Sequence, residues 1–333
     1  MNDLAIVIPA YKESFLSKTL NSLAQQTNKN FTLYIGDDCS PFDLLSVINN
    51  FKDKLEINYT RFPENIGSRD LVLQWDRCIA LTRQEKWLWL FSDDDLMDEN
   101  CVECFYEIIK KKSDTFDVYR FNTVTINEHD EILRNNPIGP EVESSEQMAY
   151  NLLKGARGNS MPDHIFSRKV YEEYGGFVYI EYAQGADWAM SILYSKENGI
   201  CIIPGAKVYW RYSGTNLSSI AFSNRANMMN GHLQFISWAL SHFAYLKEMP
   251  SDITYTMMLE ALRSNLKIVL INHYKGFNLK QILPLVNFYH KKLKVSYYNS
   301  FKELLEIQER HVPIIRKVNR LIFIIKTKLK SGE

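Results

Sequence analysis

Three consecutive carboxylates, Asp93, Asp94 and Asp95, follow the apolar run WLWLF at residues 87–91 after a single serine, Ser92. Like charges at this spacing repel one another, so the cluster requires either a bound cation or raised pKa values. The segment alone leaves both alternatives open. It does indicate that a buried strand ends in a group of residues able to do chemistry.

Polar residues also follow three other apolar runs. The first run ends in PAYKES, where the Tyr11 ring could stack on a base and Glu13 could accept hydrogen bonds. The second ends in GDDCSP, with adjacent carboxylates at Asp37 and Asp38, and the third leads into PENIGSRD. Each has an ordinary structural alternative, namely a strand-to-helix turn, an Asx turn or helix cap, or a plain helix start.

The elements that position these residues alternate between strand and helix over the first 126 residues. Continuous apolar runs predict buried strands, and apolar residues at helical spacing predict the helices between them. This alternation with short connections predicts a doubly wound, mostly parallel α/β sheet flanked by helices. The predicted strands are 4–10, 31–35, 55–62, 87–91 and 116–126, and the predicted helices are 14–26, 43–51, 68–81 and 99–112.

The rest of the chain is first irregular and then helical. SSEQ at 144–147 predicts a capping box, 155–164 a loop, 186–199 a helix, and 200–204 and 206–212 two short strands. From about residue 222 only helical patterns remain. We therefore predict a catalytic domain over 1–221 and a helical region over 222–333.

In a doubly wound sheet, ligands bind at the carboxyl ends of the strands, where the polar segments described above should meet. The order Tyr, Asp-Asp, Asn-x-Gly and Asp-Asp-Asp, each at a strand end, resembles the family 2 glycosyltransferases. This inverting family has the GT-A fold and includes enzymes of bacterial polysaccharide synthesis. The resemblance covers roughly residues 3–220 and includes the stretches AIVIPAYKES, FTLYIGDDCSP, ENIG and WLWLFSDDDLM.

The resemblance implies a nucleotide-sugar donor, most commonly a UDP-sugar. It assigns Tyr11 and Asp38 to the base, and the segment from Asn65 through Gly67 to Arg69 to the base and ribose. The same wall of the donor site would be lined by Pro9, Glu13 and Asp37.

The resemblance also implies Mg²⁺ or Mn²⁺ as cofactor. The family's D-x-D-D motif reads S-D-D-D here, with Ser92 in place of the first Asp. Asp94 aligns with the metal ligand, Asp95 is either a second metal ligand or a support for the loop, and Asp93 would reach the ribose or the metal. The metal would neutralise the leaving nucleoside diphosphate as a Lewis acid.

Inverting transfer requires a general base, which the family places before an aromatic residue beyond a GGF turn. Asp187, followed by Trp188, matches that position, although the preceding residue is Ala186 where Glu is usual. The alternative is that Asp187 only caps its helix. His164, Asp163 and Trp188 are candidates for contact with the acceptor or the sugar.

Residues 207–220, KVYWRYSGTNLSSI, resemble a family loop that folds over the diphosphate. Arg211 would pair with the phosphates, with polar support from Ser213, Asn216 and Ser218. The alternative is a surface loop with a solvated arginine.

Composition restricts partners and location. Equal numbers of basic and acidic residues, 39 of each, argue against a nucleic-acid binder. The N-terminus lacks the pattern of a signal peptide, and the five cysteines have no zinc-site or disulfide pattern. We therefore expect a cytoplasmic protein. The basic amphipathic segment 311–330 would either attach it to the inner face of the membrane or pack on the catalytic domain.

The leading hypothesis is a hexosyl- or hexosaminyltransferase acting on a glycan or lipid-linked acceptor. A catalytically silent nucleotide-sugar-binding protein is the first alternative. A sugar nucleotidyltransferase is less favoured, because it would need a glycine-rich loop after the first strand and PAYKESF contains no glycine.

Overall fold

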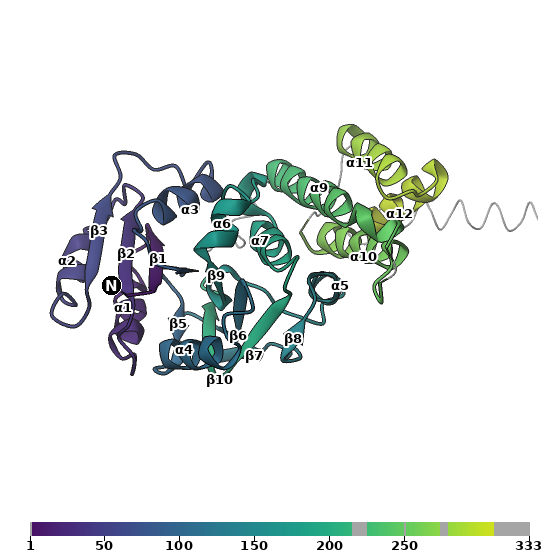
Figure 1. Cartoon of the computed structure of the whole chain (residues 1–333). Helices are drawn as coiled ribbons and strands as arrows, with labels where there is room; N and C mark the ends of the chain where they lie inside the picture. The colour runs from purple at the N-terminus through teal and green to yellow at the C-terminus, as the bar shows by residue number, and fades with distance from the viewer. Residues whose placement is uncertain (1, 215–224, 250, 274–278, 310–333) are drawn as a thin grey trace, which may run out of the picture. The chain divides into compact units, whose positions relative to one another are not determined.

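The computed structural model describes residues 2–214, 225–249, 251–273 and 279–309. The chain divides into two compact units (Figure 1). Unit 1 comprises 1–220 with 226–235, and unit 2 comprises 221–225 with 236–333. The boundary predicted between residues 221 and 222 stays a prediction.

Unit 1 is built on one mixed sheet whose strands run in the order β3-β2-β1-β4-β9-β6-β10-β5. The pairs β1–β2, β2–β3, β1–β4 and β6–β10 are parallel, while β9 lies antiparallel between β4 and β6. The predicted mostly parallel α/β sheet flanked by helices is confirmed, as a mixed sheet into which antiparallel strands such as β9 are inserted. The strands are β1 (Leu4–Ala10), β2 (Thr32–Asp37), β3 (Ile57–Arg61), β4 (Trp87–Leu90), β5 (Leu96–Met97), β6 (Val118–Ile126), β7 (Ile132–Asn135), β8 (Val142–Glu143), β9 (His164–Ser167) and β10 (Ile200–Arg211).

Helices connect these strands. Alternate residues of β1, β2 and β4 form one apolar cluster with the buried faces of α1, α2 and α4. Burial on both faces explains why β1 and β4 are continuous apolar runs. The helices of unit 1 are α1 (Leu16–Ala24), α2 (Leu44–Asn49), α3 (Leu71–Ile79), α4 (Cys101–Lys111), α5 (Ser145–Leu153), α6 (Arg168–Glu173) and α7 (Ala186–Tyr194), with short 3₁₀ turns at Met161–Asp163 and Glu181–Ala183.

Two buried tryptophan side chains pack β4 into the sheet. The Trp89 ring stacks on Phe121 of β6 at 5.1 Å between centroids, and its indole N–H donates to the Pro162 carbonyl at 2.7 Å. Both tryptophans of the run WLWLF, Trp87 and Trp89, are fully buried. Trp89 therefore holds β4, the strand that precedes the three carboxylates, against β6 and the segment before β9.

Two sequence predictions are wrong in detail. The segment 155–164 is not one loop, because it contains a 3₁₀ turn and its last residue, His164, begins β9. The two strands predicted after residue 199 are the single strand β10, interrupted by a register shift between Ile203 and Lys207. Gly205, at φ +84°, supplies the left-handed backbone that this irregularity uses.

The described part of the chain beyond residue 225 is helical. Its elements are α9 (Arg225–His242), the 3₁₀ turn Phe243–Lys247, α10 (Tyr255–His273), α11 (Leu279–Lys291) and α12 (Tyr297–Glu309). None of the helices in the described ranges is long and apolar enough to cross a bilayer. The basic segment 311–330 lies outside the described residues.

Candidate active site

The loops after β1 and β4 are joined by one carboxylate. Asp93, two residues beyond the last residue of the WLWLF run, accepts the backbone N–H groups of Tyr11 and Lys12 on a single oxygen, at 2.8 and 2.7 Å. The Ser40 hydroxyl, beyond β2, donates to the Tyr11 carbonyl at 2.7 Å. The carboxyl ends of three strands therefore form one connected edge, as the strand-end segments predict.

Lys12 is a residue of this edge that sequence analysis missed. Its ammonium is hydrogen-bonded to Asp94 and lies 3.6 Å from Asp93. Burial lowers the pKa of Lys12, but the neighbouring carboxylates outweigh that effect and raise the pKa. The available signal was a lysine two residues after the apolar end of the first strand, a position where its stem can reach the neighbouring strand end.

The three carboxylates lie in different environments. Burial and the charge of Asp94 raise the pKa of Asp93 to about 6, although Lys12 and two N–H groups lower it. Burial and Asp94 raise the pKa of Asp95 well above its usual range. Asp94 is the carboxylate to which the Lys12 ammonium is hydrogen-bonded, and Asp93 lies 3.6 Å from the same ammonium.

Arg211, at the end of β10, supports the backbone of the carboxylate segment. It is fully buried, and its backbone N–H donates to the Asp95 carboxylate at 2.7 Å. Its guanidinium donates to the carbonyls of Asp94 and Asn127 at 2.7 and 2.8 Å and pairs with Asp130 at 2.5 Å. The structure places this arginine in the interior, where it fixes the backbone of the acidic segment.

Asp38 organises the ENIG loop. It accepts the backbone N–H groups of Ile66 and Gly67, each at 2.9 Å, and pairs with Arg77. A side chain at Gly67 would bring its Cβ to 2.6 Å from the Asp38 carboxylate, so only glycine fits this approach. Asp38 therefore shapes the wall that the sequence assigns to the base.

The remaining donor candidates differ in exposure. Asp37 is fully buried and accepts from Tyr59 at 2.6 Å and from Arg61 at 2.8 Å, so its carboxylate supports the fold. Tyr11 is 41% exposed, which leaves its ring available to a planar ligand. Glu13 and Arg69 are exposed, and Pro9 and Asn65 are half-buried.

Asp187 lies in the first turn of α7 and is held by a neighbouring loop. The Asn159 amide donates to its carboxylate at 3.2 Å, and the Ser191 hydroxyl contacts the Asn159 oxygen at 3.4 Å. Burial raises the pKa of Asp187 to about 6, while Asn159 lowers it and Asp163 raises it. A carboxylate with this pKa can accept a proton near neutral pH.

His164 and Asp163 lie in the interior. His164 is fully buried, and burial lowers its pKa to about 4, so the imidazole is neutral. Asp163 is fully buried against Arg120 at 3.3 Å. Trp188 is half-buried and makes an edge contact with Phe235 at 5.8 Å. The proposed contact of His164 with a sugar stays a prediction, and the contacts described here give these residues a structural role.

A divalent metal fits this edge only as a lightly ligated ion. Within the described ranges no three His, Cys, Asp or Glu side chains gather as ligands. Asp94, whose carboxylate already holds a cation, is the side chain that would bind the metal, with further ligands coming from the donor phosphates. The assignment of Asp94 and Asp95 as metal ligands stays a prediction.

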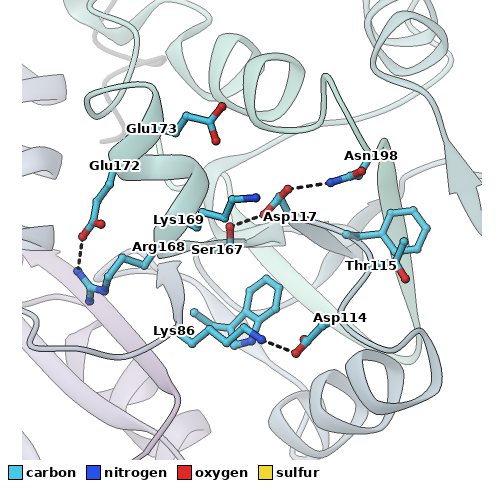
Figure 2. Close-up of a pocket in the computed structure, with 12 residues that line it drawn as sticks. Lys86, Asp114, Thr115, Asp117, Ser167, Arg168, Lys169, Glu172, Glu173 and Asn198 are labelled. Atoms are coloured by element: carbon cyan, nitrogen blue, oxygen red, sulfur yellow. Dashed lines mark hydrogen bonds and ion pairs between the residues drawn. The ribbon is translucent and has the colours of Figure 1, made fainter.

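A separate cavity of about 540 Å³ lies at the opposite end of the sheet (Figure 2). It is bordered by the first residue of β4, Trp87, and by Asp117, which accepts from Ser167 and Asn198 at 2.6 and 2.9 Å. None of the candidate site residues lines it. The cavity is therefore not the candidate active site.

Comparisons with known proteins agree on one family. The family model for glycosyl transferase family 2 matches residues 5–175, which are 171 of the 333 residues. An uncharacterized glycosyltransferase of Haemophilus influenzae is 26% identical over 176 residues, which cover 52% of this chain and 55% of that protein. The poly(ribitol-phosphate) β-N-acetylglucosaminyltransferase TarS of Staphylococcus aureus is 29% identical over 98 residues, which cover 28% of this chain and 16% of TarS.

The fold has solved counterparts. The crystal structure of TarS residues 1–349 in complex with UDP-GlcNAc matches with a TM-score of 0.64 and 14% identity, covering 93% of this chain and 91% of that one. The same TarS fragment has also been solved in complex with UDP, again with a TM-score of 0.64. At this identity the likeness concerns the fold.

We predict that Arg211→Met lowers the free energy of unfolding by about 2 kcal/mol, because it removes a buried ion pair whose partner Asp130 is partly exposed. Urea unfolding measures this change. The control is Arg69→Met, an exposed arginine paired with Glu64, which should stay within about 0.5 kcal/mol of wild type. Unchanged stability of Arg211→Met together with weaker nucleotide binding would instead assign Arg211 to the donor phosphates.

Proposed function

Because the chain belongs to glycosyl transferase family 2, we propose that it moves a sugar from a nucleoside-diphosphate donor to an acceptor hydroxyl with inversion. The observation that carries this proposal is the connected edge in which Asp93 ties the loops of β1 and β4 together. That edge brings an exposed aromatic ring, a cation-binding carboxylate and a shaped backbone loop to one end of the sheet. These are the parts needed to hold a base, a diphosphate and a ribose.

The donor is proposed to be a UDP-sugar. The exposed Tyr11 ring offers a stacking surface for a planar base, and the ENIG loop held by Asp38 forms the neighbouring wall. The TarS structures with UDP-GlcNAc and UDP support the choice of base by similarity of fold. Since the two Asp38 oxygens already accept backbone N–H groups, Asp38 contributes mainly by fixing that wall.

The cofactor is proposed to be Mg²⁺ or Mn²⁺, with Asp94 as the protein's ligand. Bound there, the ion would act as a Lewis acid that neutralises the leaving diphosphate. Asp93 keeps the Tyr11–Lys12 backbone in place beside it. Arg211 holds the Asp94 carbonyl and thereby the direction of the segment.

Asp187 is proposed as the general base that takes the proton of the acceptor hydroxyl. Its pKa of about 6 leaves it mostly ionised at neutral pH and yet basic enough to accept a proton. Asn159 orients the carboxylate through one hydrogen bond. The acceptor is proposed to be a glycan or a lipid-linked sugar, with the basic segment 311–330 as the proposed site of contact with an anionic membrane surface from the cytoplasmic side.

The first test is donor binding. We expect UDP with Mn²⁺ to raise the midpoint of thermal unfolding, because a ligand that binds the native state stabilises it by mass action. A series of UDP-sugars measured in the same way would identify the sugar by the largest rise. CMP and ATP with Mn²⁺ are the controls. If no nucleoside diphosphate stabilises the chain in the presence of metal, the proposed function is wrong.

The second test addresses the base. Asp187→Asn should lower transfer at least about 100-fold, because the amide cannot accept the proton, while UDP affinity stays at the wild-type value. Asp114→Asn is the matched control, since Asp114 lies on the surface in a left-handed turn that asparagine also adopts. Transfer by Asp187→Asn at the wild-type rate would place the base elsewhere.

The pH dependence gives a third test. The base must be ionised, so kcat/KM should fall about tenfold per pH unit as the pH drops below about 6. Asn159→Leu removes a hydrogen bond to the ionised carboxylate, so the pKa of Asp187 should rise and the acid limb should move to higher pH. Asp93 also has a pKa of about 6, but Asn159 makes no contact with it. If the acid limb of the kcat/KM profile does not move in Asn159→Leu, the limb reports the titration of Asp93 instead of Asp187.

A further inference from the structure

Lys12 places a positive charge beside Asp94, the residue proposed to bind the metal. Its ammonium is bonded to Asp94 and lies 3.6 Å from Asp93, two carboxylates that are 4% and 5% exposed. Two buried negative charges this close require a compensating positive charge. In the protein alone, that charge is the lysine.

The backbone and the side chain of Lys12 are held differently. The backbone N–H is fixed by Asp93 at 2.7 Å, which anchors the loop after β1. The side chain is 28% exposed, and its ammonium is carried on a flexible four-carbon stem. The ammonium can therefore leave Asp94 without a change in the backbone. The ammonium offers three donors and no acceptor, which suits phosphate oxygens as well as carboxylates.

We propose that Lys12 is a counter-ion of the acidic segment Asp93–Asp95. A divalent cation must displace its ammonium from Asp94, and the ammonium then binds the donor diphosphate. This inference rests on the proposed function and adds a donor-binding residue that the family motif does not assign. A divalent cation and an ammonium cannot share one carboxylate oxygen at close range without strong repulsion. Donor and metal therefore bind together, because the phosphates accept the ammonium that the metal releases.

The test compares Mn²⁺ binding to the full chain without nucleotide, measured by the electron paramagnetic resonance signal of free Mn²⁺. Lys12→Met should bind Mn²⁺ at least about tenfold more tightly than wild type, since removal of about 1.4 kcal/mol of charge repulsion corresponds to that factor. Lys12→Arg keeps the charge and should remain near wild type. Lys86→Met is the matched control, because Lys86 also pairs with an aspartate, Asp114, but at the opposite end of the sheet.

UDP affinity measured at a Mn²⁺ concentration that saturates both the wild type and the variant tests the second half of the proposal. It should fall about tenfold in Lys12→Met, because one charge-assisted contact to phosphate is lost, and stay unchanged in Lys86→Met. Mn²⁺ binding to Lys12→Met no tighter than to wild type would overturn the displacement, and unchanged UDP affinity would overturn the phosphate contact.

A measurement on the wild-type chain keeps the inference testable if Lys12→Met does not fold. Mn²⁺ should increase the rate at which an amine-reactive ester acylates Lys12, read by peptide mass spectrometry, because the released ammonium becomes accessible. Lys86 reports any general effect of the ion. An unchanged acylation rate of Lys12 overturns this inference. The proposed function is tested separately, because it requires only that UDP and Mn²⁺ together stabilise the protein. The two failures are thus distinguishable.

Discussion

The repulsion among three consecutive carboxylates at the end of β4 is the constraint on which the site depends. The structure relieves it in three different ways. Asp93 accepts two backbone N–H groups, Asp94 pairs with Lys12, and Asp95 lies buried with a pKa well above its usual range. Two of these contacts also have a structural task, since Asp93 joins two strand ends and Asp95 accepts the Arg211 N–H. The contacts that reduce the repulsion among the carboxylates therefore also fix the shape of the site.

Support for this edge comes from far along the chain. Arg211, 117 residues after Asp94, donates to the Asp94 carbonyl, and its ring partner is Phe15, whose centroid lies 4.4 Å from the guanidinium carbon. Because the arginine is fully buried, its charge is committed to carbonyls and to Asp130. The acidic segment is thus held from the β10 side while Lys12 faces it from the β1 side. A cation that enters meets a segment whose backbone is already fixed.

The candidate base is organised separately. Asp187 depends on Asn159, a residue of the segment before β9, and that segment is anchored by the buried Arg120–Asp163 pair. Asp163 thus holds the segment that carries Asn159, and the proposed contacts of His164 and Asp163 with a sugar stay predictions.

The sequence by itself determined the family, the α/β class and the strand ends that carry the site, because buried strands and polar strand ends leave strong local patterns at LAIVIPA, TLYIGD and WLWLF. It also pointed to Asp187 as the base through its position before Trp188, and that assignment stays a prediction. Only the tertiary structure decided what each charge does. For Lys12 the sequence offered only its place two residues after the first strand, and the pairing with Asp94 is a tertiary contact. Arg211, which matches a family loop expected to bind the diphosphate, is buried, and the four residues of β9 are too few to show a period. Pairing and burial depend on residues distant in sequence, and those contacts set the charge state and direction of every side chain at the site.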